Sequence, residues 1–231
     1  MTGLEVQCVQ LRHEYVMDGE TVVALDGIDL TIAAGVTTAV VGPSGSGKST
    51  LLTILAGLQR PTAGEALIGG VDIAAMRQGA LLRERAERIG VLAQGPGRNL
   101  LPYLDAAGNI RFAQCGARSY RRRELPDADD LLRELGLDAL GGTRVDRLSG
   151  GERQRLAVAT AVSGAPGVLL ADEPTSQLDL ANRDRVVELL ERVNQSFGTT
   201  VVAVTHDPEI AGRFGQSVRI ESGRLVRGGW G

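Results

Sequence analysis

Residues 37–58 have the sequence TTAVVGPSGSGKSTLLTILAGL, and this stretch decides the fold class. The β-branched start, residues 37–41, is typical of a short buried strand. Apolar side chains then recur at the i, i+3, i+4 and i+7 spacing of an amphipathic helix, at Leu51, Ile54, Leu55 and Leu58. The loop between them, GPSGSGKS, satisfies G-x-x-x-x-G-K-[ST] in the strand–loop–helix context that this motif requires.

This loop predicts a binding site for a nucleoside triphosphate. Its glycines permit a tight turn, so that backbone N–H groups face a polyphosphate at the positive end of the helix. Lys48 is expected to reach the outer phosphates, and the Ser49 hydroxyl is suited to Mg²⁺. Lys48 is the sole lysine among 25 basic residues, which favours a role that a planar guanidinium cannot fill. The predicted phosphate-binding residues are Gly42, Pro43, Ser44, Gly45, Ser46, Gly47, Lys48, Ser49 and Thr50.

Two further apolar runs end in polar side chains. The strand predicted at residues 168–171 is followed by Asp172 and Glu173, and the strand at 200–205 by His206. Ligands of open α/β sheets lie beyond the carboxyl ends of the strands, so these side chains should lie near the phosphates. Asp172 is expected to hold Mg²⁺, and Glu173 to polarise the water that attacks the γ-phosphate. His206 is either a proton-sharing or γ-phosphate contact, or else a helix cap or a surface histidine.

A second anion site is predicted at Ser149, Gly150, Gly151 and Glu152, which precede a helix expected to run to residue 163. Ser149 and Glu152 have the spacing of a capping box. The two glycines leave the helix start open to another molecule's phosphate oxygens. Because the first loop already surrounds one triphosphate, we expect two copies of the chain to pair head to tail, each offering this loop to the other's nucleotide.

The alternation of strands and helices predicts an α/β fold with a mostly parallel sheet covered on both faces. Residues 95–166 contain no convincing strand and are predicted to form an inserted helical subdomain. Residues 1–94 and 167–231 would form the nucleotide-binding core. One long helix is expected over residues 125–140.

Composition excludes several classes of protein. The 231-residue chain has 25 basic and 28 acidic side chains, a net charge of −3 that argues against coating nucleic acid. No apolar run reaches the roughly 18 residues of a bilayer-spanning helix, and the amino terminus lacks the pattern of a secretory signal. The two cysteines, Cys8 and Cys115, make no disulfide framework, which favours a reducing, cytoplasmic location.

The motifs occur in the order and spacing of ABC ATPases, and the chain resembles the nucleotide-binding subunit of an ABC transporter. The resemblance implies the P-loop NTPase fold of that family, an antiparallel β edge, ATP hydrolysis and separate transmembrane permease subunits. It implies a peripheral place on the inner face of the cell membrane and no nucleic-acid partner. By the same resemblance, Tyr15 matches the aromatic that stacks on adenine, with an edge-strand aromatic as the alternative. Gln94 matches the glutamine that touches Mg²⁺ or water and senses the membrane partner. His206 matches the γ-phosphate switch histidine, and Asp179 an aspartate that crosses the dimer interface.

Within this family the chain is similar to the macrolide-export, lipoprotein-release and cell-division branch. Residues 25–30, LDGIDL, and residues 99–102, NLLP, carry that similarity. The departures are a GPG sequence after Gln94 and a bulky Gln177 where relatives carry a small residue. The arginine run at 121–123 is expected to be a solvated helix face, with a lipid-headgroup or partner contact as the other reading.

Alternative functions remain open at this stage. The same ATP-driven clamp could serve as a scaffold or regulator at the division site, using identical residues. A DNA-repair clamp would need coiled coils or zinc-binding cysteines, and a two-cassette translation factor would need a second phosphate loop. A simple P-loop kinase does not explain the Ser149–Glu152 motif.

Overall fold

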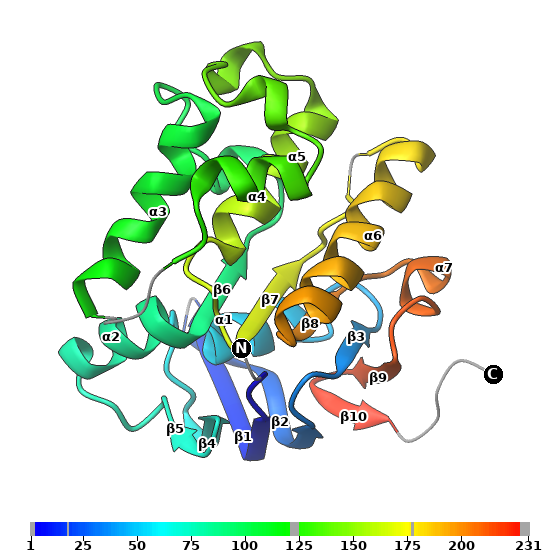
Figure 1. Cartoon of the computed structure of the whole chain (residues 1–231). Helices are drawn as coiled ribbons and strands as arrows, with labels where there is room; N and C mark the ends of the chain where they lie inside the picture. The colour runs from blue at the N-terminus through cyan, green and yellow to red at the C-terminus, as the bar shows by residue number, and fades with distance from the viewer. Residues whose placement is uncertain (1–2, 18, 121–124, 177, 227–231) are drawn as a thin grey trace.

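The computed structural model describes residues 3–17, 19–120, 125–176 and 178–226, which form two sheets flanked by helices (Figure 1). The larger sheet has the strand order β10-β9-β3-β8-β7-β6. Each neighbouring pair from β9 through β3, β8 and β7 to β6 is parallel. Strand β10 pairs antiparallel with β9 at the edge of the sheet. The mostly parallel sheet and its antiparallel edge are therefore confirmed. The strands are β3 (Thr37–Val41), β6 (Ile89–Leu92), β7 (Val168–Asp172), β8 (Thr200–Val204), β9 (Gln216–Glu221) and β10 (Arg224–Val226).

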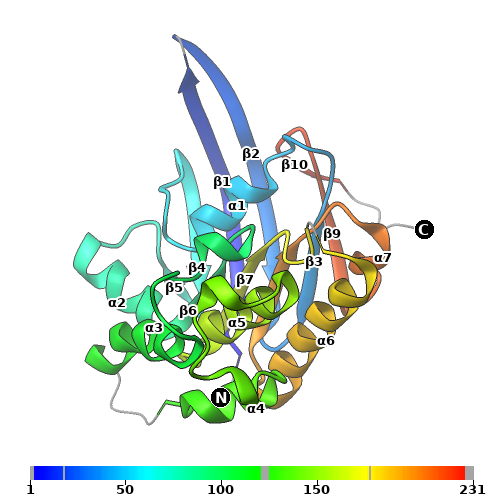
Figure 2. The same ribbon diagram turned by 90° about the horizontal axis from the view of Figure 1, so that it is seen from above.

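The smaller sheet is antiparallel, with the order β2-β1-β4-β5. Its strands are β1 (Val6–Met17), β2 (Glu20–Ile32), β4 (Ala63–Ile68) and β5 (Val71–Asp72). The hairpin of β1 and β2 projects beyond the rest of the molecule (Figure 2). The alternation of apolar and polar residues over 25–32 is typical of a half-buried strand and matches β2, whereas no regular pattern marks β1. Its register shifts at three places between Cys8 and Glu14, and at the first of them Val9 and Gln10 are both exposed, which breaks the alternation of buried and exposed side chains.

The larger sheet is covered on both faces, as its apolar strands predicted. Val201 and Ala203 of β8 pack into one hydrophobic cluster, and Val202 and Val204 into another. The first cluster includes side chains of α3 (Ala106–Tyr120), α4 (Ala128–Glu134), α5 (Gly150–Val162) and α6 (Leu180–Phe197). The second includes α1 (Lys48–Leu55) and the smaller sheet. The elements that carry the candidate site are thus held between two separate cores.

The remaining helices are short or polar. They are α2 (Gln78–Arg88), α7 (Pro208–Ala211) and the 3₁₀ turns η1 (Pro96–Arg98), η2 (Asp138–Leu140) and η3 (Val145–Arg147). Within the described part of residues 95–166 there are helices and one isolated bridge, Asp105 to Arg144, but no strand. No helix among the described residues combines the length and the apolar character needed to span a bilayer. The subdomain boundaries themselves stay a prediction.

Two helices are shorter than the sequence pattern predicted, and glycine explains both. The helix expected over residues 125–140 is divided: α4 ends at Glu134, Gly136 has a φ of 64°, and η2 follows. Helix α1 ends at Leu55 because Gly57, with a φ of 63°, turns the chain, and Leu58 is left exposed. The arginine run at 121–123 and Gln177 lie outside the described residues.

Candidate nucleotide-binding site

The loop between β3 and α1 presents an open helix start. Its N-cap is Gly47, with a φ of 101°, and no side chain caps the helix. A Cβ atom on Gly47 would lie 2.3 Å from the Ala24 carbonyl oxygen, and one on Gly42 would lie 2.0 Å from that of Ile220. Both positions therefore require glycine. With neither a capping side chain nor an acidic residue in the first turn, the amide end of α1 suits an anion.

The turn between β9 and β10 supports this loop from behind. The Gly223 N–H donates to the Ser46 carbonyl at 3.1 Å, and the Asp26 N–H donates to the Gly223 carbonyl at 2.8 Å. The Ser46 hydroxyl is buried and has no hydrogen-bond partner among the described residues. The backbone of the loop is therefore anchored to two strands that are distant in sequence.

Lys48 lies within the loop that precedes it. Its side chain is only 7% exposed, and Nζ donates to the carbonyls of Gly42 at 2.9 Å and Pro43 at 2.8 Å. Burial lowers the pKa of Lys48, while the negative charges of Glu173 and Asp172 act in the opposite direction. The ammonium is thus surrounded by groups that stabilise a cation and leave little space around it.

A cavity of about 650 Å³ opens beside the loop, within the range of nucleotide-sized pockets. It brings together side chains from both sheets and from the loops at the carboxyl ends of β6, β7 and β8. Its lining residues are Tyr15, Val22, Val23, Ala24, Ser44, Gly45, Ser46, Gly47, Lys48, Ser49, Thr50, Gln94, Glu173, Val204 and His206.

The polar side chains after β7 and β8 meet at this cavity. Ser49 Oγ donates to Asp172 Oδ1 at 3.1 Å, which joins the end of β7 to the start of α1. His206 Nδ1 and Glu173 Oε1 are 2.9 Å apart. Glu173 has a φ of 46°, unusual for a residue with a side chain, and its N–H donates to the Val204 carbonyl at 3.0 Å. The backbone that carries the Glu173 carboxylate is therefore held in one conformation at the end of β7.

Tyr15 and Gln94 lie on different walls of the cavity. The Tyr15 hydroxyl lies 3.2 Å from Thr50 Oγ1 and donates to Gln59 Oε1 at 3.1 Å. Gln94 follows β6 in a turn held by Asn99, whose side chain bonds to Ala93 N–H and to the Ala93 carbonyl, each at 2.8 Å.

The loop before α5 does not reach this cavity in the same chain. The Ser149 N–H donates to Glu152 Oε2 at 2.7 Å and the Glu152 N–H donates to Ser149 Oγ at 3.3 Å, so the predicted capping box is confirmed. These bonds hold the pKa of Glu152 below its usual range. No atom lies within 4 Å of a Cβ built on Gly150, whereas one on Gly151 would meet Asn182 Oδ1 at 2.3 Å. Gly150 thus exposes the helix start.

Comparison with known proteins decides the family. The family model described as ABC transporter matches residues 25–176. The chain belongs to the ABC transporter ATPase family. It is similar to the lipoprotein-releasing system ATP-binding protein LolD of Anaeromyxobacter dehalogenans (strain 2CP-C), at 40% identity over 97% of this chain and 93% of that protein.

Two further relatives extend the comparison. The macrolide export ATP-binding/permease protein MacB of Rhodopseudomonas palustris (strain HaA2) is 38% identical over 98% of this chain, which spans 34% of that protein. A solved dimer of the ATP-binding cassette MJ0796, in a post-hydrolysis state with ADP and Pi, superposes with a TM-score of 0.84. Its sequence identity is 31%, over 96% of this chain and 97% of that one. This ABC ATPase therefore binds and hydrolyses ATP, and it resembles the macrolide-export and lipoprotein-release branch.

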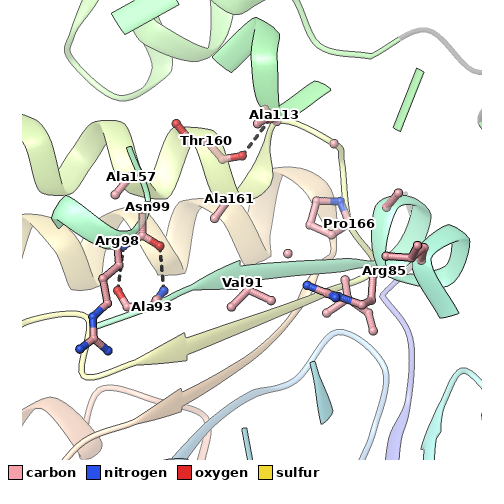
Figure 3. Close-up of a pocket in the computed structure, with 16 residues that line it drawn as sticks. Arg85, Val91, Ala93, Arg98, Asn99, Ala113, Ala157, Thr160, Ala161 and Pro166 are labelled. Carbon is pink, nitrogen blue, oxygen red and sulfur yellow. Dashed lines mark hydrogen bonds between the residues drawn. The ribbon is translucent and has the colours of Figure 1, made fainter. Parts of the chain in front are cut away.

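A second hollow of the ABC ATPase, of about 500 Å³, lies between α2, α3, α5 and β6 (Figure 3). Arg98 and Arg85 lie at opposite ends of it, with Val91 and Ala161 between them. Burial lowers the pKa of Arg85. In the part of the chain that the structure describes, neither arginine forms a salt bridge. The hollow is therefore apolar in the middle and basic at its ends.

Sequence reasoning missed several residues at the site. Val22, Val23 and Ala24 of β2 line the cavity, but nothing in their sequence marks them. Gln154 is buried in α5 and donates to the Pro174 carbonyl at 2.7 Å. This bond connects α5 to the loop that carries Glu173. These roles arise from tertiary packing and carry no local sequence signal.

Proposed function

We propose that this ABC ATPase works as a head-to-tail pair in which each nucleotide lies between two chains. One copy supplies the loop of Lys48 and Ser49, and the other supplies Ser149, Gly150, Gly151 and Glu152. The observation that carries the proposal is the uncovered surface at Gly150, where a built Cβ meets no atom within 4 Å and which lies away from the cavity of its own chain. Asp179, which caps α6, would lie at the same interface.

Each side chain around the cavity would have a different role in ATP hydrolysis. Lys48 and the loop amides would bind the β- and γ-phosphates and stabilise charge that develops in the transition state. Glu173 would orient and polarise the attacking water, whose oxygen bonds to the γ-phosphorus as the bond to the bridging oxygen of ADP breaks. His206, 2.9 Å from Glu173, would hold that carboxylate and contact the γ-phosphate. Tyr15 would stack on the adenine.

A magnesium ion fits the residues beside the loop. Mg²⁺ keeps several waters and takes only one or two protein ligands when phosphates supply the others. The Ser49 hydroxyl and the Asp172 carboxylate already lie 3.1 Å apart, and Gln94 lines the same cavity as Ser49. We propose that Ser49 binds the ion, with Asp172 and Gln94 acting directly or through water. The ion would neutralise phosphate charge during the transfer.

We further propose that separate transmembrane permease subunits dock over the second hollow, near Gln94. Its basic ends, Arg85 and Arg98, favour a segment that carries acidic side chains. The names of the relatives, lipoprotein-releasing system and macrolide export, support a role in transport. The chain would then lie on the cytoplasmic face of the cell membrane, held there by the permease.

A mixing experiment tests the shared site. Lys48→Ala removes the phosphate lysine, and Gly150→Arg blocks the helix start at a position with room for a side chain. Each variant alone should be inactive. An equimolar mixture should recover about a quarter of wild-type turnover, because half of the pairs are mixed and each mixed pair has one intact site of two. A mixture as inactive as its components would contradict the proposal.

A further inference from the structure

His13 is a buried polar residue that the proposed chemistry does not use. It lies on β1, two positions before Tyr15, and is 7% exposed. Its ring meets the Tyr15 ring edge to face, with centroids 4.7 Å apart and an interplanar angle of 82°. This is a favourable arrangement for two aromatic rings. His13 therefore packs directly on the side chain proposed to stack on the base.

Gln59 joins His13 to the Tyr15 hydroxyl. The Gln59 Oε1 atom accepts from the Tyr15 hydroxyl at 3.1 Å and lies 3.3 Å from Thr53 Oγ1, whose proton has a nearer acceptor in the Thr50 carbonyl at 2.9 Å. The oxygen end of the amide thus faces the Tyr15 hydroxyl, and the NH₂ end lies 2.7 Å from His13 Nε2. Because an amide NH₂ only donates, Nε2 must accept, and the ring proton is assigned to Nδ1. Nδ1 is buried without a partner among the described residues.

The same hydroxyl reaches the phosphate loop. Tyr15 Oη lies 3.2 Å from Thr50 Oγ1, and Thr50 follows Ser49 in the first turn of α1. The Tyr15 side chain is therefore held at its ring by His13 and at its hydroxyl by Gln59 and Thr50. A side chain restrained in this way loses little conformational freedom when a ligand binds.

We propose that His13 and Gln59 are positioning residues that fix the Tyr15 ring for the nucleotide base and couple it to the phosphate loop. This inference rests on the proposed function, in which Tyr15 stacks on the adenine. The pair acts through Tyr15 and touches no phosphate. The pair therefore strengthens binding of a nucleotide that carries a base. It does not affect how tightly the phosphate loop binds a polyphosphate without a base.

Calorimetric titration with Mg-ATP and with inorganic tripolyphosphate separates these contributions. His13→Ala and Gln59→Met should each weaken ATP binding about three- to tenfold, the range measured for aromatic pairs and single hydrogen bonds. Binding of tripolyphosphate should change less than twofold. In turnover assays the KM for ATP should rise while kcat is nearly unchanged. His13→Phe keeps the ring contact but loses the Nε2 acceptor, and should fall between wild type and His13→Ala.

Two controls make the test decisive. Cys8→Ala alters another buried residue of β1, 2% exposed, and should bind both ligands as wild type does. Adding His13→Ala to Tyr15→Ala should cause no further loss of ATP affinity, since the pair acts through that ring.

Three results would overturn the inference. First, ATP affinity could be unchanged in both His13→Ala and Gln59→Met but weakened in Tyr15→Ala. The inference would then fail, and the proposed function would stand. Equal loss of ATP and tripolyphosphate affinity would show a general structural role. If Tyr15→Ala itself binds ATP as wild type does, the role proposed for Tyr15 fails, and this inference fails with it.

Discussion

His206 Nδ1 lies 2.9 Å from Glu173 Oε1, so the ends of β8 and β7 are joined at the mouth of the nucleotide cavity. The two side chains differ in environment: that of Glu173 is 14% exposed and that of His206 is 72% exposed. The carboxylate is thus enclosed and constrained by its backbone, while the imidazole faces outward. A ligand or second chain that covers His206 can therefore change the surroundings of Glu173 without touching it.

Replacing Glu173 with Gln should nearly abolish ATP hydrolysis while ATP binding persists, because the amide cannot accept a proton from the attacking water. The ATP-bound pair should then accumulate. Phosphate release and light scattering with Mg-ATP measure the two effects. Glu188→Gln removes an exposed carboxylate of α6 and should hydrolyse ATP normally. Undiminished turnover in Glu173→Gln would remove Glu173 from the reaction.

Replacing Lys48 with Arg should weaken Mg-ATP binding by about tenfold or more, although the charge is kept. The Lys48 ammonium is buried and bonded to the carbonyls of Gly42 and Pro43, and a planar guanidinium needs more space and different donor directions. Calorimetric titration measures the loss. The control is Arg153→Lys, which exchanges the same two residue types in the reverse sense outside the cavity and should leave the affinity unchanged. Wild-type affinity in Lys48→Arg would show that the loop requires only a positive charge.

Replacing Gly42 with Ala should lower the free energy of unfolding by about 2 kcal/mol or more. The added Cβ would lie 2.0 Å from the Ile220 carbonyl oxygen, and the φ of 149° is strained for a side chain. Gly142→Ala adds a Cβ with no atom within 4 Å and should change stability by less than about 0.5 kcal/mol. Urea denaturation compares them. Equal stability of the two variants would mean that the loop shifts to accommodate the methyl group.

The capping box of α5 should contribute a pH-dependent part of stability. Hydrogen bonds from Ser149 lower the pKa of Glu152 below its ordinary 4.5. A depressed carboxyl pKa stabilises the fold above the unfolded-state value, and this contribution is lost as pH falls through the folded-state value. Glu152→Gln keeps an acceptor for the Ser149 N–H, so its unfolding free energy should fall less than that of wild type between about pH 6 and about pH 3.

Denaturation at a series of pH values measures this difference. Asp138→Asn, which removes a carboxylate from η2, controls for the general loss of negative charge. Parallel curves for wild type and Glu152→Gln would mean that the hydrogen bonds seen at the helix start do not contribute to the pH dependence.

The sequence predicted the central part of the fold because its strands are strongly apolar. Residues 38–41, 168–171 and 200–204 are buried, and such short continuous apolar runs are typical of strands that are covered on both faces of a sheet. Helix α2 was missed because none of its residues is buried, which leaves no apolar stripe to detect. Strand β1 was missed because the alternation of buried and exposed side chains is interrupted at Val9 and Gln10, where its register first shifts.

The site was predicted only where local chemistry marks it. The glycine-rich loop, the acids after β7 and the capping box have sequence patterns with a direct physical meaning. The contact of His13 and Gln59 with Tyr15 joins positions on a strand and beyond the end of a helix, so no spacing in the sequence indicates it. The expectation that the Ser149–Glu152 loop serves another copy's nucleotide came from the sequence, and the absence of that loop from the lining of its own chain's cavity agrees with it.

The support of Ser46 by Gly223 has a consequence for synthesis of the chain. The phosphate loop leaves the ribosome early, whereas the turn whose Gly223 N–H donates to the loop emerges only after most of the polypeptide. The loop of the nascent amino-terminal part therefore lacks this support, and a product of premature termination before residue 223 should bind nucleotide less tightly than the full chain. Unfinished chains should thus gain less stability from a bound ligand than finished ones do.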